Sequence, residues 1–149
     1  MSIRDARPED AAEVAVLLGE LGYPGTPELT ARNIQRFLDG PGFRLQVAHG
    51  ADGVVGLVAT HVVPRLDNDQ ITCRITDIVV ASAHRRSGVG TILLQGAVKH
   101  AREVGAPRLD LSSGEWRADA HAFYLAHGFE TRSRGFTKHL RVDAQTVGD

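Results

Sequence analysis

The sequence predicts an α/β protein in which helices pack on both faces of a mixed, mostly antiparallel sheet. Apolar residues recur at helical spacing in several segments, and β-branched runs of strand length alternate with them. Short glycine turns join some consecutive strands, which implies antiparallel pairing, while helices join others and imply crossovers. The 149 residues are predicted to form a single domain, 1–149, with a core of about 3–142.

The first part of the chain predicts one strand and two helices. Residues 2–6 have the pattern of a short strand. Pro8 suits the first turn of a helix, whose apolar stripe repeats at i, i+3, i+4 and i+7: Val14, Leu17, Leu18 and Leu21. Thr26 as N-cap and Pro27 at the first helical position begin a second helix, with a buried face expected to hold Ile34, Phe37 and Leu38.

The middle of the chain predicts four strands and a central helix. Residues 43–49 and 54–63 are apolar runs on either side of an Asp-Gly turn, which indicates a hairpin. Residues 71–80 form the next strand. A helix follows over 89–104, and the alternating segment 108–112 is expected to be another strand.

The last part of the chain predicts one more helix followed by extended chain. Residues from about 116 to 127 have a helical pattern, and Gly128 is placed to close the helix at C′. Residues 129–142 are then expected to return as one or two strands.

Composition and charge exclude several classes of function. A net charge of −1 gives no global field for nucleic acid or an anionic membrane, so an anion site must be local. Cys73 is the single cysteine, which excludes an intrachain disulfide, and the histidines form no cluster that predicts a metal site. The first ten residues lack the apolar core of a signal peptide, and no run approaches the roughly 20 apolar residues of a membrane span. We expect a cytoplasmic protein.

A glycine turn between the strand 71–80 and the central helix predicts a phosphate site. Its sequence is Arg85-Arg86-Ser87-Gly88-Val89-Gly90-Thr91. Free backbone N–H groups at a helix N-terminus bind phosphate, and the glycines allow the backbone to approach an anion closely. The turn lacks the Lys-Ser/Thr of a Walker loop, and Leu93 stands where a dinucleotide fingerprint needs its third glycine.

Two motifs together resemble the GCN5-related N-acetyltransferases (GNAT). Arg85, Gly88 and Gly90 match the family's Arg/Gln-x-x-Gly-x-Gly signature, and Tyr124-x-x-x-Gly128-Phe129 resembles its Tyr-x-x-x-Gly-Phe turn. The order of helices and strands agrees over nearly the whole chain. The resemblance implies a sheet whose central strands splay apart.

The resemblance also implies where the cosubstrate acetyl-CoA binds. Its pyrophosphate is expected on the loop amides, and its pantetheine along the strand before the loop, where a backbone N–H, that of Val79 in our interpretation, polarises the thioester carbonyl. The implied cofactor-binding residues are Ile78, Val79, Val80, Arg85, Arg86, Ser87, Gly88, Val89, Gly90 and Thr91.

Tyr124 and Asp77 are the candidate catalytic residues. The resemblance implies that Tyr124 occupies the position of the family's general acid, which protonates the leaving thiolate. A tyrosine beside Phe123 can equally belong to a core. Asp77 is a candidate base for the amine or a solvated acid at the sheet edge, and alternation places it on one face with Val79. Glu115 and His61 are reserve candidates for the base.

One departure from the family pattern concerns the acceptor side. Many relatives carry Asn seven residues before the tyrosine, where this chain has Arg117. The contact that this Asn makes to cofactor or backbone is therefore in doubt. We expect the surrounding segment 112–117 to line the acceptor side instead, with Trp116 as a wall.

The expected reaction is acetylation of a primary amine of a small molecule by direct attack. A non-catalytic acyl-CoA-binding regulatory domain, or acetylation of a protein N-terminus or lysine, are the alternatives. Four acidic residues would suit a cationic amine: Asp67, Asp69, Asp77 and Glu115. Relatives often pair through sheet edges, so a homodimer is expected.

Overall fold

The computed structural model describes residues 1–112, 118–132 and 135–141. The chain falls into two compact units, Met1–Leu111 and Ser112–Asp149. The first unit holds the sheet and three α-helices, and the second holds one described helix.

The sheet of the first unit is mixed, as predicted. It has five described strands in the order β1-β2-β3-β4-β5. The first four pair antiparallel with their neighbours, and β5 pairs parallel with β4 because α3 crosses over between them. The strands are β1 (Ser2–Asp5), β2 (Phe43–Gly50), β3 (Gly53–Pro64), β4 (Ile71–Val80) and β5 (Leu109–Leu111).

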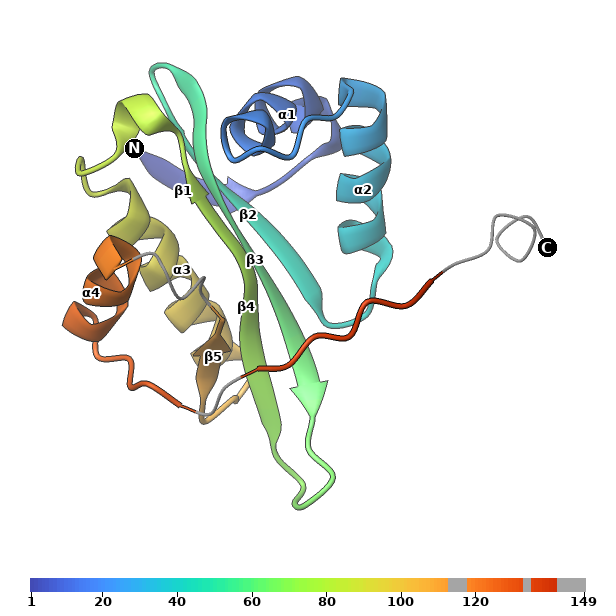
Figure 1. The fold of residues 1–149 in the computed structure, drawn as a ribbon, viewed down its shortest axis with the longest axis vertical. Helices are drawn as coiled ribbons and strands as arrows, with labels where there is room; N and C mark the ends of the chain where they lie inside the picture. The colour runs from blue at the N-terminus through green and yellow to red at the C-terminus, as the bar shows by residue number, and fades with distance from the viewer. Residues whose placement is uncertain (113–117, 133–134, 142–149) are drawn as a thin grey trace. The chain divides into compact units, whose positions relative to one another are not determined.

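Helices cover both faces of this sheet (Figure 1). A 3-10 turn, η1 (Pro8–Asp10), leads into α1 (Ala11–Glu20), and α2 (Pro27–Asp39) lies on the same face. Side chains of these two helices pack on those of the strands in one apolar core, which includes Val14, Leu17, Ile34, Leu57, Ala59 and Val79. α3 (Val89–Glu103) covers the opposite face. Its Leu93 packs so closely on Gly56 of β3 that a Cβ at Gly56 would lie 2.9 Å from Leu93 Cδ1.

The helix N-termini follow the expected chemistry. Thr26 Oγ1 accepts a hydrogen bond from the Leu29 amide at 3.1 Å, and this confirms Thr26 as the N-cap of α2. Leu38, however, is 43% exposed rather than part of the buried face, because the stripe that packs on the sheet runs through Ile34 and Phe37.

Asp10 is a buried charge at the start of α1. It accepts two hydrogen bonds from Arg4 at 2.8 Å each and one from the Arg7 amide at 2.8 Å. The Arg4 guanidinium lowers the pKa of Asp10 despite its burial. This pair ties the first strand to the first helix.

A β-bulge interrupts the pairing of β3 with β4. Ala59 lies opposite Asp77 and Thr60 opposite Ile75, so Thr76 is an extra residue on β4. The Thr76 hydroxyl donates to the Ala59 carbonyl at 3.4 Å. Because strand residues alternate between faces, one extra residue reverses which face the following side chains occupy.

The second unit contains α4 (Ala118–Ala126), which Gly128 closes as predicted. The Phe129 amide bonds to the Tyr124 carbonyl and the Gly128 amide to the Leu125 carbonyl, each at 3.1 Å, and Gly128 has φ +88°. This is a Schellman cap, and the Tyr124 and Phe129 rings make its apolar contact.

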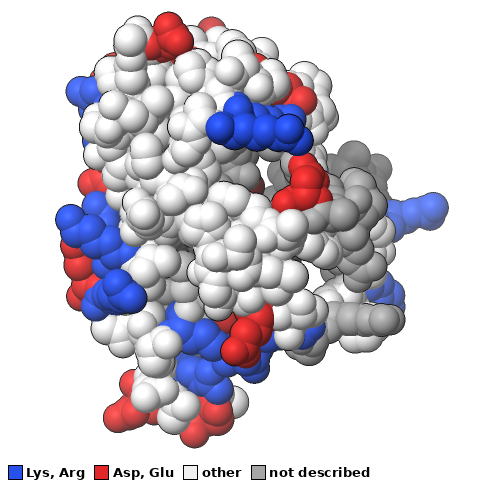
Figure 2. Space-filling model, turned by 90° about the vertical axis from the view of Figure 1, so that its left-hand side faces the viewer, with Lys and Arg blue, Asp and Glu red and all other residues white. Residues whose placement is uncertain are grey.

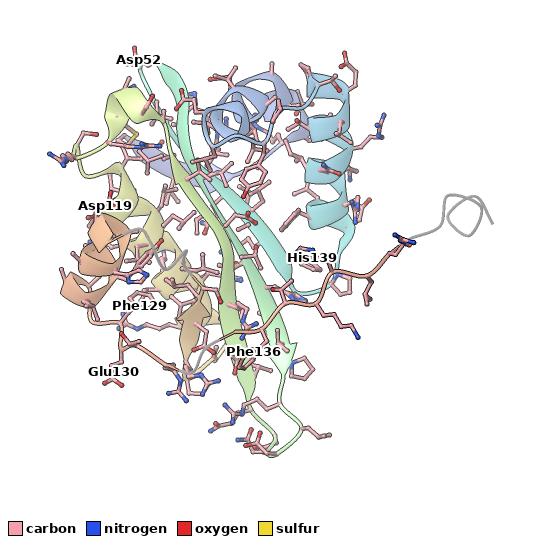
Figure 3. All side chains as sticks on the ribbon, in the orientation of Figure 1. Asp52, Asp119, Phe129, Glu130, Phe136 and His139 are labelled. Carbon is pink, nitrogen blue, oxygen red and sulfur yellow. The ribbon has the colours of Figure 1, made fainter. Side chains whose placement is uncertain are left out.

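The predicted strands over 129–142 are not formed in the described part of this segment. Residues 129–132 and 135–141 have extended or irregular backbone without ladder bonds. A strand needs a hydrogen-bonded neighbour, and this segment has none among the described residues. The side chain of Phe136, labelled in Figure 3, is 96% exposed.

Candidate functional site

A tight loop joins β4 to α3 and presents backbone amides at the helix start. The 3-10 turn η2 (Ser82–His84) leaves the strand, and α3 begins at Val89. The first bond of its ladder runs from the Ile92 amide to the Gly88 carbonyl at 3.1 Å. The amides of Val89 and Gly90 therefore precede the helical ladder, at the positive end of the helix dipole.

Two loop residues have left-handed backbone. Gly88 has φ +88°, and a Cβ at this position would meet no atom within 4 Å. Arg86 has φ +63°, which costs a side-chain-bearing residue free energy. A strained residue in a short loop is typical of a ligand-binding turn.

The loop is anchored by contacts from distant segments. Glu20, at the end of α1, accepts a hydrogen bond from the Ser82 amide at 2.8 Å, and this bond lowers the pKa of Glu20. His84 Nε2 lies 3.3 Å from Asp52 Oδ2 at the tip of the β2–β3 turn (Figure 3). Ser87 Oγ donates to the His84 carbonyl.

The end of β4 that leads into this loop has an open edge. β5 pairs only with Cys73–Ile75, so among the described residues β4 has no neighbour on that side from Thr76 to Val80. Within the described residues, the pairing of β4 with β5 thus ends before β4 reaches the loop. An open edge presents N–H and C=O groups that an extended ligand can bind.

The register shows which amides face this open edge. The Ala81 amide bonds to the Val55 carbonyl of β3 at 2.8 Å. Hydrogen-bonded pairs alternate in an antiparallel ladder, so Val79 also bonds to β3, opposite Leu57. The amides of Ile78 and Val80 therefore face the open edge, whereas the amide of Val79, the donor expected from the sequence, faces β3.

Arg85 contributes to the same edge. Its Nε donates to the Val80 carbonyl at 3.4 Å. This contact agrees with the alternation, since it uses the group of Val80 that β3 does not. A cationic side chain thus lies where the strand turns into the loop.

Asp77 lies on the face of the sheet that α1 and α2 cover, beyond the reach of their packing. It is opposite Ala59 and two residues from Val79, both of which belong to the α1–α2 core. This confirms that Asp77 and Val79 share a face. The carboxylate is exposed. Asp77 is therefore accessible to a solute on this face.

His61 is held by its neighbours. Its ring stacks on Phe43 with centroids 3.9 Å apart and planes 2° apart, and Phe37 packs edge-on against the same phenylalanine. A stacked ring of this kind is ordinary packing. The reserve role of His61 as the base has no support in these contacts.

Tyr124 lies in the second unit, on the last turn of α4. The side chain is half-buried between Phe123 and Phe129, whose ring centroids are 5.5 Å and 5.9 Å from its own. The Tyr-Gly-Phe spacing is thus required by the Schellman cap itself. Glu115, Trp116 and Arg117 lie outside the described residues.

The model of the acetyltransferase (GNAT) family matches residues 13–129. The chain belongs to the GNAT family. It is therefore an acyltransferase, and enzymes of this family use acetyl-CoA as cosubstrate.

Individual relatives agree with the family. The chain is 32% identical over 143 residues to the aminoalkylphosphonate N-acetyltransferase of Salmonella typhimurium, covering 93% of this chain and 90% of that protein. Among solved structures, a transcriptional regulator from Bacillus halodurans has TM-score 0.86 at 24% identity, covering 93% and 99% of the two chains. A GNAT family acetyltransferase from Staphylococcus aureus has TM-score 0.80 at 22% identity, covering 94% and 100%. These two structures show the same fold.

The geometry of the loop fits the pyrophosphate of acetyl-CoA, since amides at a helix start and two arginines offer what an anion needs. The described residues contain no group of three His, Cys, Asp or Glu that could hold a metal ion. Within the same residues, every helix is too short or too polar to span a membrane.

Proposed function

We propose that this GNAT enzyme transfers the acetyl group of acetyl-CoA to the primary amine of a small molecule by direct attack. One observation carries the proposal: the open edge of β4 runs directly into the glycine loop. Amides suited to a thioester arm and amides suited to a pyrophosphate thus follow one another along a single strand and turn. The name of the Salmonella relative supports a small-molecule amine as acceptor.

Backbone amides and two arginines bind the acetyl donor, acetyl-CoA. The amides of Val89 and Gly90, with Arg85 and Arg86 beside them, bind the pyrophosphate. The edge of β4 from Ile78 to Val80 binds the pantetheine arm, as an added strand would. Bound acetyl-CoA supplies the activated acetyl group. The amide of Ile78 or Val80 stabilises negative charge on its carbonyl oxygen.

Two side chains move protons. Asp77 accepts a proton from the ammonium group of the acceptor, so that a neutral amine can attack. Tyr124 donates the phenolic proton to the departing thiolate, which the family's Tyr-x-x-x-Gly-Phe motif supports. The neutral amine nitrogen forms a bond to the acetyl carbonyl carbon, and the carbon–sulfur bond breaks as CoA thiol leaves. Two protons leave the nitrogen in all: Asp77 passes the first to solvent, and the second, lost after attack, restores the Tyr124 phenol.

The direct test is release of CoA thiol from acetyl-CoA with a panel of small primary amines, read together with the mass of the product. We expect a product heavier by one acetyl group and a matching rate of thiol release. Tight binding of acetyl-CoA in calorimetry, without transfer to any amine or peptide, would instead establish an acyl-CoA-binding module.

We further propose that the protein acts in the cytoplasm as a homodimer. The single buried thiol, Cys73, suits a reducing compartment. Light scattering after gel filtration measures the mass directly, and a value of 16.1 kDa would contradict the dimer.

A further inference from the structure

A charged cavity lies at the other end of β4 from the glycine loop. It has a volume of about 250 Å³ and is lined by the ends of β3 and β4, the turn between them and the start of β5. Three arginines and two aspartates surround it: Arg65, Arg74, Arg108, Asp67 and Asp110. Basic and acidic side chains gather at the end of the molecule where the β3–β4 turn lies (Figure 2).

The aspartates are already engaged by two of the arginines. Arg65 donates to both carboxylate oxygens of Asp67, at 3.0 and 2.9 Å. Arg108 Nε lies 3.0 Å from Asp110 Oδ1, although this nitrogen is buried and donates no hydrogen bond among the described residues. Asp67 and Asp110 are therefore partners of arginines rather than recognition groups for a cationic amine.

Arg74 is the unpaired cation of the cavity. Its side chain is exposed, and within the described residues it forms neither an ion pair nor a hydrogen bond. Three positive and two negative side chains leave a net charge of +1 around the cavity. A guanidinium with five free N–H donors at the wall of a small cavity is suited to a phosphonate, phosphate or carboxylate.

The bulge places Arg74 on the same face as Asp77. Arg74 lies opposite His61, and Asp77 opposite Ala59, two residues apart on the unbulged strand β3. Without Thr76 as the extra residue, alternation would put Arg74 and Asp77 on opposite faces. The cation and the candidate base are at most about 10 Å apart along the strand, within the reach of one small molecule.

We infer that the acceptor carries an anionic group as well as its amine, and that Arg74 binds this group in the cavity while Asp77 receives the amine. The inference rests on the proposed function. It names the acceptor by its chemistry, a short amine with a phosphonate, phosphate or carboxylate. It also replaces the expectation of a cationic acceptor based on Asp67, Asp69, Asp77 and Glu115.

The test compares three amines of similar size in the thiol-release assay: 2-aminoethylphosphonate, β-alanine and ethanolamine. We expect the KM of at least one of the two amines that carry an anionic group to be about tenfold below that of ethanolamine, which carries none. The preference between phosphonate and carboxylate identifies the anion. Equal KM values for all three amines would overturn the inference while leaving the acetyltransferase proposal intact.

The Arg74→Gln variant assigns the effect to this residue. It should raise the KM of the preferred anionic amine about tenfold, without changing kcat/KM for ethanolamine or the KM of acetyl-CoA. Arg32→Gln, an exposed arginine of α2, is the matched control and should change none of these values. A loss shared equally by amines with and without an anionic group in Arg74→Gln would overturn the assignment.

Binding of a non-reactive anion tests the cavity without any catalysis. Methylphosphonate should bind to the wild type in calorimetry and not to Arg74→Gln, whether or not any amine is acetylated. If no amine is acetylated, the proposed function fails while this result still decides the inference. Equal binding of methylphosphonate to both proteins, or to neither, would overturn it.

Discussion

The two ends of β4 offer different groups to a ligand. At the C-terminal end, the groups that we propose for binding are main-chain amides, those of Ile78 and Val80 on the open edge and those of Val89 and Gly90 in the loop. At the N-terminal end, the cavity is lined by charged side chains around Arg74. Asp77 lies between the two ends.

Because of this difference, we expect different substitutions to weaken ligand binding at the two ends of β4. A site made of amides depends on backbone conformation, so a methyl group on Gly88 should affect it more than the loss of a charge. A site made of side chains depends on single charged groups, so it should change its ligand when one arginine is replaced. The following predictions separate these contributions.

Asp77→Asn should have the largest effect. We expect kcat with the preferred amine to fall about 10³-fold, because the amide cannot accept the proton. The KM of acetyl-CoA should not change, since Asp77 belongs to neither end. Steady-state kinetics checks both values. Asp69→Asn, an exposed acid of the β3–β4 turn, is the control. Unchanged kcat in Asp77→Asn would remove this residue from the reaction.

Tyr124→Phe should lower kcat about 10²-fold through loss of the proton donor. The phenyl ring keeps the apolar contact with Phe129, so the thermal midpoint should stay close to that of the wild type. Tyr23→Phe, at an exposed tyrosine of the α1–α2 connection, is the matched control. A variant that is less stable yet has full turnover would show that Tyr124 acts only in the Schellman cap.

Gly88→Ala should weaken acetyl-CoA binding about tenfold, because alanine is strained at φ +88°. A Cβ would meet no atom within 4 Å, so the effect would come from the backbone alone. Gly105→Ala has matched geometry, with φ +80° and open space, at the far end of α3. Calorimetry should show similar losses of stability in both variants and weaker binding only in Gly88→Ala. Equal affinity in the two variants would refute a special role for the loop backbone.

Glu20→Gln should have the smallest effect, about twofold on the KM of acetyl-CoA, because it weakens one exposed anchor of the loop. The Ser82 amide lowers the pKa of Glu20, so the carboxylate stabilises the wild-type fold above the usual carboxyl range. That stabilisation is lost as pH falls through the lowered pKa. Thermal midpoints between pH 3 and 6 should fall more steeply for the wild type than for the variant. Parallel curves would contradict the anchor.

Much of the backbone site could be predicted from the sequence. Gly88 and the strand before it have strong local signatures, and the cap of α2 at Thr26 follows from residue type alone. The amides that face the open edge lie one residue to either side of Val79, because a sequence carries the period of a strand but not the phase of its ladder.

The charged cavity at the N-terminal end of β4 could not be predicted, because the position of Arg74 depends on the bulge. Thr76 has no feature that marks it as an extra residue, and without the bulge Arg74 and Asp77 are assigned to opposite faces. The arginine partners of Asp67 and Asp110 could not be predicted either, because the side-chain contacts form only in the folded structure. Residues 129–142 are predicted as one or two strands, but a sequence does not show whether a neighbouring edge is available to them.

Amide hydrogen exchange along β4, with and without acetyl-CoA, tests the central claim most directly. We predict that the Val79 and Ala81 amides are protected in the free protein, whereas those of Ile78 and Val80 exchange fast and become protected when acetyl-CoA binds. Fast exchange at Val79, with ligand protection there and none at Ile78 or Val80, would contradict the account.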